Sequence, residues 1–201
     1  IIDTIPVVGV VGNMMLWASG VDIGEGNKSF IRNALGDDFQ DTWSLAEFLY
    51  ESHKEFFLLP SDIAVEVDGN RVAMNVSELP TKYPIYDIGI STLQEIRPLM
   101  INAGCILWNG PASYFELPGF AFGTIEILNM CTESSAVTIV GGGHTSSLVS
   151  NRGVADSVTH NSTGGGACLT MLSGGLMPVI ESLNKSNDKF RSLLPSLELD
   201  N

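Results

Sequence analysis

The sequence predicts an α/β fold, a doubly wound parallel sheet of the Rossmann-like kind with a small β-hairpin insertion. Short apolar runs typical of buried strands alternate with helix-like stretches along the 201 residues. Two glycine triplets, at 141–143 and 164–166, each separate a strand-like run from a helix-like stretch. Glycine permits the sharp turn by which a chain leaves a buried strand and enters a helix packed on the sheet.

The first part of the chain contains apolar runs, amphipathic stretches and one hairpin signal. Strands are expected at 5–11 and 55–60, and helices at 13–19, 28–35 and 44–54. The pair Asp68-Gly69 lies between two alternating runs, 63–67 and 71–76. An Asp-Gly pair in this setting is a strong hairpin signal, and the hairpin is interpreted as an insertion rather than part of the main sheet.

The second part of the chain alternates strands and helices more regularly. Strands are expected at 105–109, 137–140 and 158–161. Helices are expected at 92–102, 120–132, 145–151 and 167–172, with Pro98 weakening or kinking the first of them. Trp108 is assigned to the core. A hinge-like 174–178 then leads into a partly polar amphipathic helix.

Composition and charge exclude several functional classes. The apolar fraction of 44% is enough for the core of one domain. With 23 acidic and 10 basic residues the net charge is −13, which argues against nucleic-acid or anionic-membrane partners. Neither an apolar stretch long enough for a membrane helix nor a signal peptide is recognised. Cys105, Cys131 and Cys168 form no CxxC pair and are interpreted as reduced thiols of an intracellular protein.

The glycine triplets predict a phosphate site. A helix that starts at such a turn offers free N–H groups and the positive end of its dipole to an anion. Two such turns, about twenty residues apart, indicate a site built from the carboxyl ends of neighbouring strands. Ordinary tight turns are the alternative reading. Neither loop contains Lys or Arg, and Arg152 is the one basic residue between them, so a phosphate-binding lysine is expected outside this sequence.

Five ordered motifs resemble phosphoglycerate kinases over essentially the whole chain. Residues 108–116, WNGPASYFE, resemble the family's WNGPMGVFE segment, and the triplets resemble its GGGD(T) and STGGGA segments. Residues 87–89 resemble the DIGP turn, and 18–24 the stretch after the first helix of the lobe. His144, where many relatives have Asp, is similar to the archaeal branch.

The resemblance implies one lobe of a two-lobe enzyme. Residues 1–175 would be the carboxyl-terminal nucleotide-binding lobe, incomplete at its start, and 176–201 a hinge and interlobe tail. Members of this family transfer phosphate reversibly between 1,3-bisphosphoglycerate and ADP, giving 3-phosphoglycerate and ATP, in cytoplasmic glycolysis and gluconeogenesis. ADP or ATP with Mg²⁺ would bind this chain. The sugar phosphates would be held only through the missing lobe, so the chain would be inactive alone.

The resemblance also implies roles for individual residues. Gly164, Gly165 and Gly166 would face the transferring phosphoryl group. The opposite side of the phosphates would be lined by Gly141, Gly142, Gly143, His144 and Thr145. Asn109 and Pro111 would flank the nucleotide. Glu116 would accept hydrogen bonds from the ribose hydroxyls, and Gly89 would give close access to the adenine ring. No residue is assigned to metal, because Mg²⁺ prefers oxygen ligands and His144 is a poor one.

Two other classes are weighed against this one. A stand-alone, non-catalytic nucleotide-binding or interaction domain would keep the fold and the glycine turns. A dinucleotide oxidoreductase would need GxGxxG after the first strand and an acidic residue about twenty positions later, and the sequence has neither. The tail adds a stripe of apolar positions that needs a surface to cover, namely Val179, Ile180, Leu183, Phe190, Leu193 and Leu194.

Overall fold

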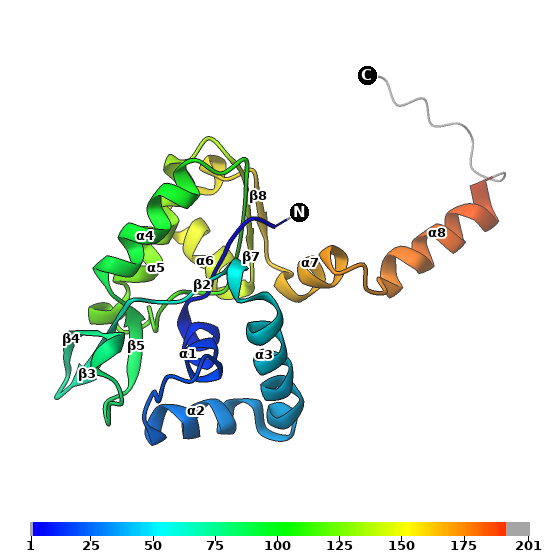
Figure 1. The fold of residues 1–201 in the computed structure, drawn as a ribbon. Coiled ribbons are helices and arrows are strands. Elements are labelled where there is room, and N and C mark those ends of the chain that lie inside the picture. The colour runs from blue at the N-terminus through cyan, green and yellow to red at the C-terminus, as the bar shows by residue number, and fades with distance from the viewer. Residues whose placement is uncertain (1, 192–201) are drawn as a thin grey trace.

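A computed structural model describes residues 2–191 and shows an α/β fold with parallel sheets (Figure 1). The amino-terminal half contains a two-stranded parallel sheet of β1 (Ile5–Pro6) and β2 (Phe57–Leu58). Three helices lie between these strands, α1 (Gly9–Ala18), α2 (Glu25–Leu35) and α3 (Phe39–His53). The predicted fold class is therefore confirmed.

The first strand is much shorter than predicted. The sequence analysis placed a strand over 5–11, whereas the chain turns into α1 at Gly9, whose φ of +62° is in the left-handed region. Val10 and Val11 consequently lie on a helix, and both are exposed. A short apolar run does not by itself distinguish a strand from the start of a helix, which is why the prediction was wrong here.

The predicted strand at 55–60 is also reduced, to the half-buried pair Phe57–Leu58. It pairs only with β1, so within residues 2–191 the parallel strands form two separate sheets rather than one continuous sheet. The second parallel sheet has the order β6-β7-β8.

The hairpin prediction is confirmed and extended by a third strand. β3 (Asp62–Val67) pairs antiparallel with β4 (Asn70–Asn75) around Asp68 and Gly69, both with positive φ. β5 (Ile85–Ile88), predicted only as a stretch leaving a loop, pairs antiparallel with the other edge of β3. The insertion is therefore a three-stranded sheet in the order β4-β3-β5, and β5 leads directly to Gly89.

The carboxyl-terminal half alternates as predicted. Its helices are α4 (Ile90–Ile101), α5 (Phe122–Glu133), α6 (Gly143–Asn151), α7 (Gly165–Leu172) and α8 (Pro178–Phe190). Its strands are β6 (Cys105–Asn109), β7 (Val137–Gly141) and β8 (His160–Ser162). Pro98 lies inside α4, which continues past it to Ile101.

The register of the β6-β7-β8 sheet positions the candidate site. Asn109 pairs with Gly141, and Gly141 pairs with Ser162. The three parallel strands therefore end in line, and both glycine turns leave from this one carboxyl edge. The main core lies behind the sheet, where Trp108, Val140 and Val149 pack with the inner faces of α4 and α5. The assignment of Trp108 to the core is confirmed.

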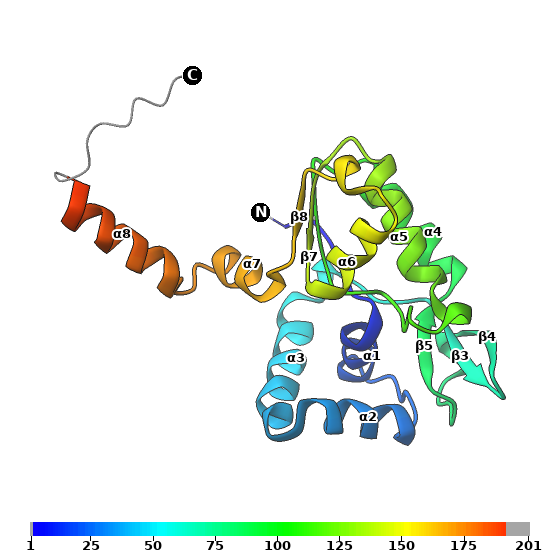
Figure 2. The same ribbon diagram turned by 180° about the vertical axis from the view of Figure 1, so that it is seen from behind.

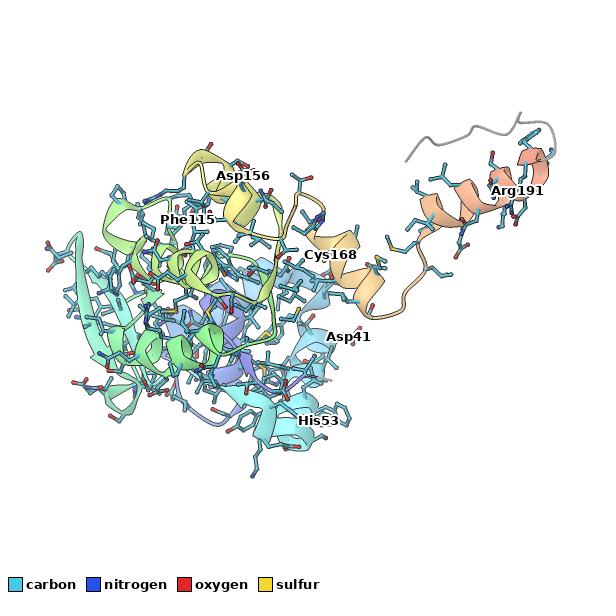
Figure 3. The ribbon with its side chains drawn as sticks, turned by 90° about the horizontal axis from the view of Figure 1, so that it is seen from above. Asp41, His53, Phe115, Asp156, Cys168 and Arg191 are labelled. Carbon is cyan, nitrogen blue, oxygen red and sulfur yellow. The ribbon has the colours of Figure 1, made fainter. Side chains whose placement is uncertain are left out.

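The last two helices leave the body of the molecule. Figures 1 and 2 show α7 and α8 leading away from the sheets in both views, and in Figure 3 Cys168 on α7 lies between the body and the end of α8 at Arg191. All three cysteines are free. Within the described part of the chain, no helix has the length and apolar character needed to cross a membrane.

Asp87 on β5 joins three elements through a buried carboxylate. Its oxygens accept hydrogen bonds from the N–H of Gly123 at the start of α5, and Arg71 of β4 lies 3.4 Å away. The Arg71 guanidinium also donates to the Ile88 carbonyl and lies over the Phe122 ring. Burial raises the pKa of Asp87 from 3.8 to about 6, although the Gly123 N–H and Arg71 favour the charged form.

This raised pKa predicts a specific pH dependence of stability. The folded chain holds the Asp87 proton more tightly than the unfolded chain, so this contribution is fully present below about pH 4 and is lost as the pH rises through 6. Relative to the wild type, Asp87→Asn should gain roughly 2 kcal/mol in free energy of unfolding between pH 4 and pH 7, at about 1.4 kcal/mol per pKa unit. Urea unfolding of both proteins across this range measures the difference. A difference that does not change with pH would contradict the account.

Candidate functional site

Three backbone segments meet at the carboxyl edge of the β6-β7-β8 sheet. A Cβ built on Gly165 would lie 2.6 Å from both the Cα and the N of Gly142, and 2.8 Å from Oδ1 of Asn109. A Cβ built on Gly141 would lie 2.8 Å from the same amide oxygen. No side chain fits at Gly165, because the obstacles include main-chain atoms of Gly142 that cannot move aside. At Gly141 the close obstacle is the side-chain amide of Asn109. The two glycine triplets and Asn109, far apart in sequence, therefore form one packed unit.

The first turn is held by a buried hydroxyl. Gly142 has a φ of +99°, in the left-handed region that favours glycine, and it directly precedes α6. The Thr145 hydroxyl is buried and donates to the carbonyl oxygens of Gly141 and Gly142. Thr145, predicted as a phosphate contact, thus uses its side chain to fix the turn.

The amino ends of α6 and α7 lie side by side as a result. Gly143 and His144 are exposed at the first turn, and Gly164 and Gly166 at the second. A Cβ on Gly143 or Gly166 would meet no other atom within 4 Å, so the space in front of both positions is open. Two adjacent helix amino ends present free N–H groups and positive dipole ends, which is a suitable arrangement for an anion such as phosphate.

The charges around this edge come mainly from the backbone. Arg152, the basic residue nearest in sequence to both triplets, lies at the carboxyl end of α6, the opposite end of that helix. Apart from His144, the residues of the two turns are glycines and residues with hydroxyl side chains. Any additional positive charge on a bound phosphate must come from groups outside these loops.

The loop from β6 to α5 carries two further predicted residues. Gly110 turns this loop with a φ of +86°. The Pro111 carbonyl packs against Gly9, where a Cβ would lie 2.7 Å from its oxygen, so the start of α1 is brought to the same edge. Glu116 lies farther along the loop and is exposed. One edge of the sheet therefore brings together Asn109, Pro111 and the two triplets. Glu116 lies farther along the same loop.

Gly89 lies in a different environment. It is buried, and a Cβ there would lie 2.2 to 2.5 Å from the carboxyl group of Asp62. This carboxylate accepts hydrogen bonds from the N–H groups of Ser91 and Thr92 and thereby caps α4. Burial alone would raise the pKa of Asp62, but these donors hold it below its usual value. The side of Gly89 on which a Cβ would lie is filled by the Asp62 carboxylate, so this position requires glycine.

The donors present do not form a magnesium site of their own. His144 is exposed, the Thr145 hydroxyl is used by the turn, and no group of three or more His, Cys, Asp or Glu side chains clusters for a metal within residues 2–191. Mg²⁺ keeps much of its water and prefers oxygen ligands.

Sequence reasoning missed the groups that organise the surroundings of the site. Asp62 and Asp87 were not assigned roles, although each is a buried carboxylate that receives N–H groups at the start of a helix. Tyr86 and Tyr114, whose rings pack edge to face at 5.3 Å, were not singled out either. An Asp at the start of a strand gives no local signal, because its partner lies about thirty residues later.

Parallel strands that end in glycine turns leading into adjacent helices define the class of Rossmann-like α/β proteins. Within this class the relationship is specific. The model of the phosphoglycerate kinase family matches residues 1–175, and the chain belongs to this family.

Relatives and solved structures agree with this assignment. The phosphoglycerate kinase of Methanopyrus kandleri is 39% identical over 175 residues, which are 87% of this chain and 42% of that protein. The Methanobacterium bryantii enzyme is 39% identical over 189 residues, 94% of this chain and 45% of that protein. The predicted resemblance to archaeal members is confirmed.

The solved structures also show how much of a relative this chain represents. The crystal structure of phosphoglycerate kinase from Pyrococcus horikoshii OT3 matches with a TM-score of 0.84 and 32% identity, over 94% of this chain and 46% of that chain. The Coxiella burnetii enzyme matches with a TM-score of 0.70 and 33% identity, over 87% and 44%. The chain spans about half the length of the relatives it matches.

The close contact at Gly165 predicts a contrast between neighbouring glycines. Gly165→Ala should destabilise the protein by about 1–3 kcal/mol, because its methyl group must displace the backbone of Gly142. Gly166→Ala places the same methyl group in open space within α7 and should be neutral or slightly stabilising. Thermal unfolding of both variants measures the difference. Equal melting temperatures would show that the two turns do not pack as described.

Proposed function

We propose that this chain is the nucleotide-binding lobe of a phosphoglycerate kinase, with residues 1–175 forming the lobe and 176–201 the hinge and interlobe tail. Within the full two-lobe enzyme it would bind ADP or ATP for reversible phosphoryl transfer between 1,3-bisphosphoglycerate and ADP. The observation that carries the proposal is the contact of Gly142, Gly165 and Asn109, which sets two helix amino ends at one edge of the sheet.

Phosphoryl transfer requires the kind of groups that lie at this edge of the sheet. Phosphoryl transfer depends on in-line positioning and on stabilising the charge of the moving group, with little covalent work by the protein. The backbone N–H groups at Gly165 and Gly166 would face the transferring phosphoryl group, and those at Gly143 and His144 would meet the phosphates from the other side. Asn109 and Pro111 would border the nucleotide, and the exposed Glu116 would be available for ribose hydroxyls.

The basic groups that the reaction needs must come from outside this edge of the sheet. The loops contain no Lys or Arg, and acyl-phosphate binding needs basic groups that this edge does not provide. We therefore expect this chain to bind nucleotide weakly and not to turn over alone, because orienting both reactants is worth about 7 to 11 kcal/mol of the barrier. The sugar phosphates would be bound through the other half of the enzyme.

Nucleotide binding tests the proposal through glycines that do not support the packing. Gly143→Val and Gly166→Val add side chains only to the open space in front of the helix ends, so each should weaken ADP binding by at least about tenfold without lowering the melting temperature. Gly104→Val is the matched control, since Gly104 is equally open but precedes the amino end of β6. Calorimetric titration of ADP, with and without Mg²⁺, gives the affinities.

Each outcome of this titration has a defined meaning. Loss of ADP binding in the two site variants and its retention in the control would support a phosphate site formed by the two glycine triplets. An unchanged affinity in Gly143→Val and Gly166→Val would show the triplets to be ordinary turns. Robust ATP formation from 1,3-bisphosphoglycerate by this chain alone would contradict the division of labour between two lobes, and a reading frame that encodes no second lobe would favour the stand-alone domain.

The assignment of the tail rests on the exposure of its apolar side chains. Leu176, Val179 and Leu183 are 77%, 73% and 63% exposed. The helix α8, which begins at Pro178, leads away from the body (Figures 1 and 2). The predicted positions Leu193 and Leu194 lie outside the described residues. A helix with such a stripe gains its stability by covering another surface, and we assign that surface to the other lobe.

Hydrogen exchange tests the tail assignment. Amides of α8 should exchange fast, because little packing protects them, whereas those of β7 between Val137 and Gly141 should exchange slowly. Mass spectrometry of peptides from both regions measures the contrast in the monomer. Protection of α8 equal to that of β7 would mean that the tail packs on its own lobe, and the hinge assignment would be wrong.

A further inference from the structure

We propose that Thr124 is a positioning residue, whose hydroxyl group, paired with that of Ser113, holds the loop after β6 in the shape that borders a nucleotide. This inference rests on the proposed function and adds to it the side chain on which the loop depends. The loop covers residues 110–116 and carries Pro111 and Glu116. We call it the nucleotide loop.

The first argument is the hydrogen bonding of Thr124, which lies in the first turn of α5. Its Oγ1 accepts the Ala112 N–H at 3.1 Å and lies 2.6 Å from the hydroxyl oxygen of Ser113, so one side chain holds two consecutive residues of the loop. Thr124 and Ala112 are both 0% exposed, and Ser113 is 7% exposed. Removing this hydroxyl group would therefore leave buried polar groups without a partner, which is costly.

The second argument is that the first turn of α5 is itself fixed in place. The N–H of Gly123, the residue before Thr124, donates to both carboxylate oxygens of Asp87, at 3.2 and 3.1 Å. A Cβ built on Gly123 would collide with one of these oxygens, so only glycine allows this approach. Arg71 lies 3.4 Å from the same carboxylate and donates to the Ile88 carbonyl at 2.9 Å. The Thr124 hydroxyl group is therefore held at a defined place relative to β5.

The third argument is that the nucleotide loop has few other attachments. Within residues 2–191, two further hydrogen bonds join it to other segments, from the N–H of Gly110 to Gly141 and from the N–H of Tyr114 to Tyr86. Ala112 and Ser113 lie between these two points, and the loop continues to the exposed Glu116. The bonds to Thr124 consequently set the path of the chain between its two backbone attachments.

A loop that samples several shapes binds its ligand more weakly, because binding must also order the loop. In the proposed function, ADP touches both the nucleotide loop and the helix amino ends, whereas pyrophosphate touches only the helix ends. The helix ends have supports of their own, the Thr145 hydroxyl and the packing of Gly165 on Gly142. Loss of the Thr124 hydroxyl group should therefore weaken ADP and spare pyrophosphate.

Matched substitutions at Thr124 test this inference by calorimetric titration of both ligands. Thr124→Val keeps the shape of the side chain and removes the hydroxyl group. It should weaken ADP about threefold to tenfold, as expected for the loss of a buried hydrogen bond, and leave pyrophosphate unchanged. Thr124→Ser keeps the hydroxyl group and should retain most of the ADP affinity. Thr138→Val is the control, because Thr138 is also buried but its hydroxyl donates to Ala136 at the amino end of β7.

The results that would overturn the inference are specific. Equal weakening of ADP and pyrophosphate in Thr124→Val would indicate a general loss of packing rather than a role in positioning the loop. A loss of ADP affinity in Thr124→Ser as large as that in Thr124→Val would assign the effect to the methyl group. If Thr124→Val does not fold, Ser113→Ala decides, because it removes one of the two bonds, and an unchanged ADP affinity there overturns the inference.

The same titrations separate this inference from the proposed function. If Gly143→Val and Gly166→Val weaken ADP but Thr124→Val does not, the proposed phosphate site stands and only the role of Thr124 is wrong. Failure of the wild type to bind ADP overturns the proposed function and, with it, this inference.

Discussion

The arrangement of this protein depends on one contact, the packing of the Gly142 backbone against Gly165 around the amide oxygen of Asn109. Asn109 ends β6, Gly142 lies between β7 and α6, and Gly165 begins α7. The approach requires glycine at 165, where a Cβ would meet the Gly142 backbone, and it is helped by the left-handed φ of Gly142. The contact fixes the relative position of α6 and α7, and with it the pair of helix amino ends that we propose as the site for an anion.

Other features serve to hold this edge in place. The Thr145 hydroxyl closes the first turn, and the paired strands β6, β7 and β8 bring Asn109, Gly141 and Ser162 into line. The buried carboxylates of Asp62 and Asp87 attach the antiparallel sheet to the starts of α4 and α5. The loop with Glu116 continues from the end of β6, so the surroundings of the proposed nucleotide are built from elements that are widely separated in sequence.

Much of this was predictable from sequence, for physical reasons. The strand 105–109 matches β6, because four apolar residues and Asn109 between two glycines have few alternatives. The Asp68-Gly69 pair specified its hairpin locally. The failures share one cause, which is dependence on distant partners. The turn at Gly9 depends on the carbonyl of Pro111, and the third strand β5 depends on β3. Periodicity and propensity carry no information on such contacts.

The central claim, that both glycine turns form one phosphate site, is tested most directly by nuclear magnetic resonance. Pyrophosphate, and then ADP, would be titrated into the isotope-labelled chain while the backbone amides and the Asn109 side-chain amide are followed. We expect the amides of 142–145 and 164–167 to shift together, at the same ligand concentration, with Asn109. Shifts confined to one of the two turns, or spread over the surface without either, would contradict the account.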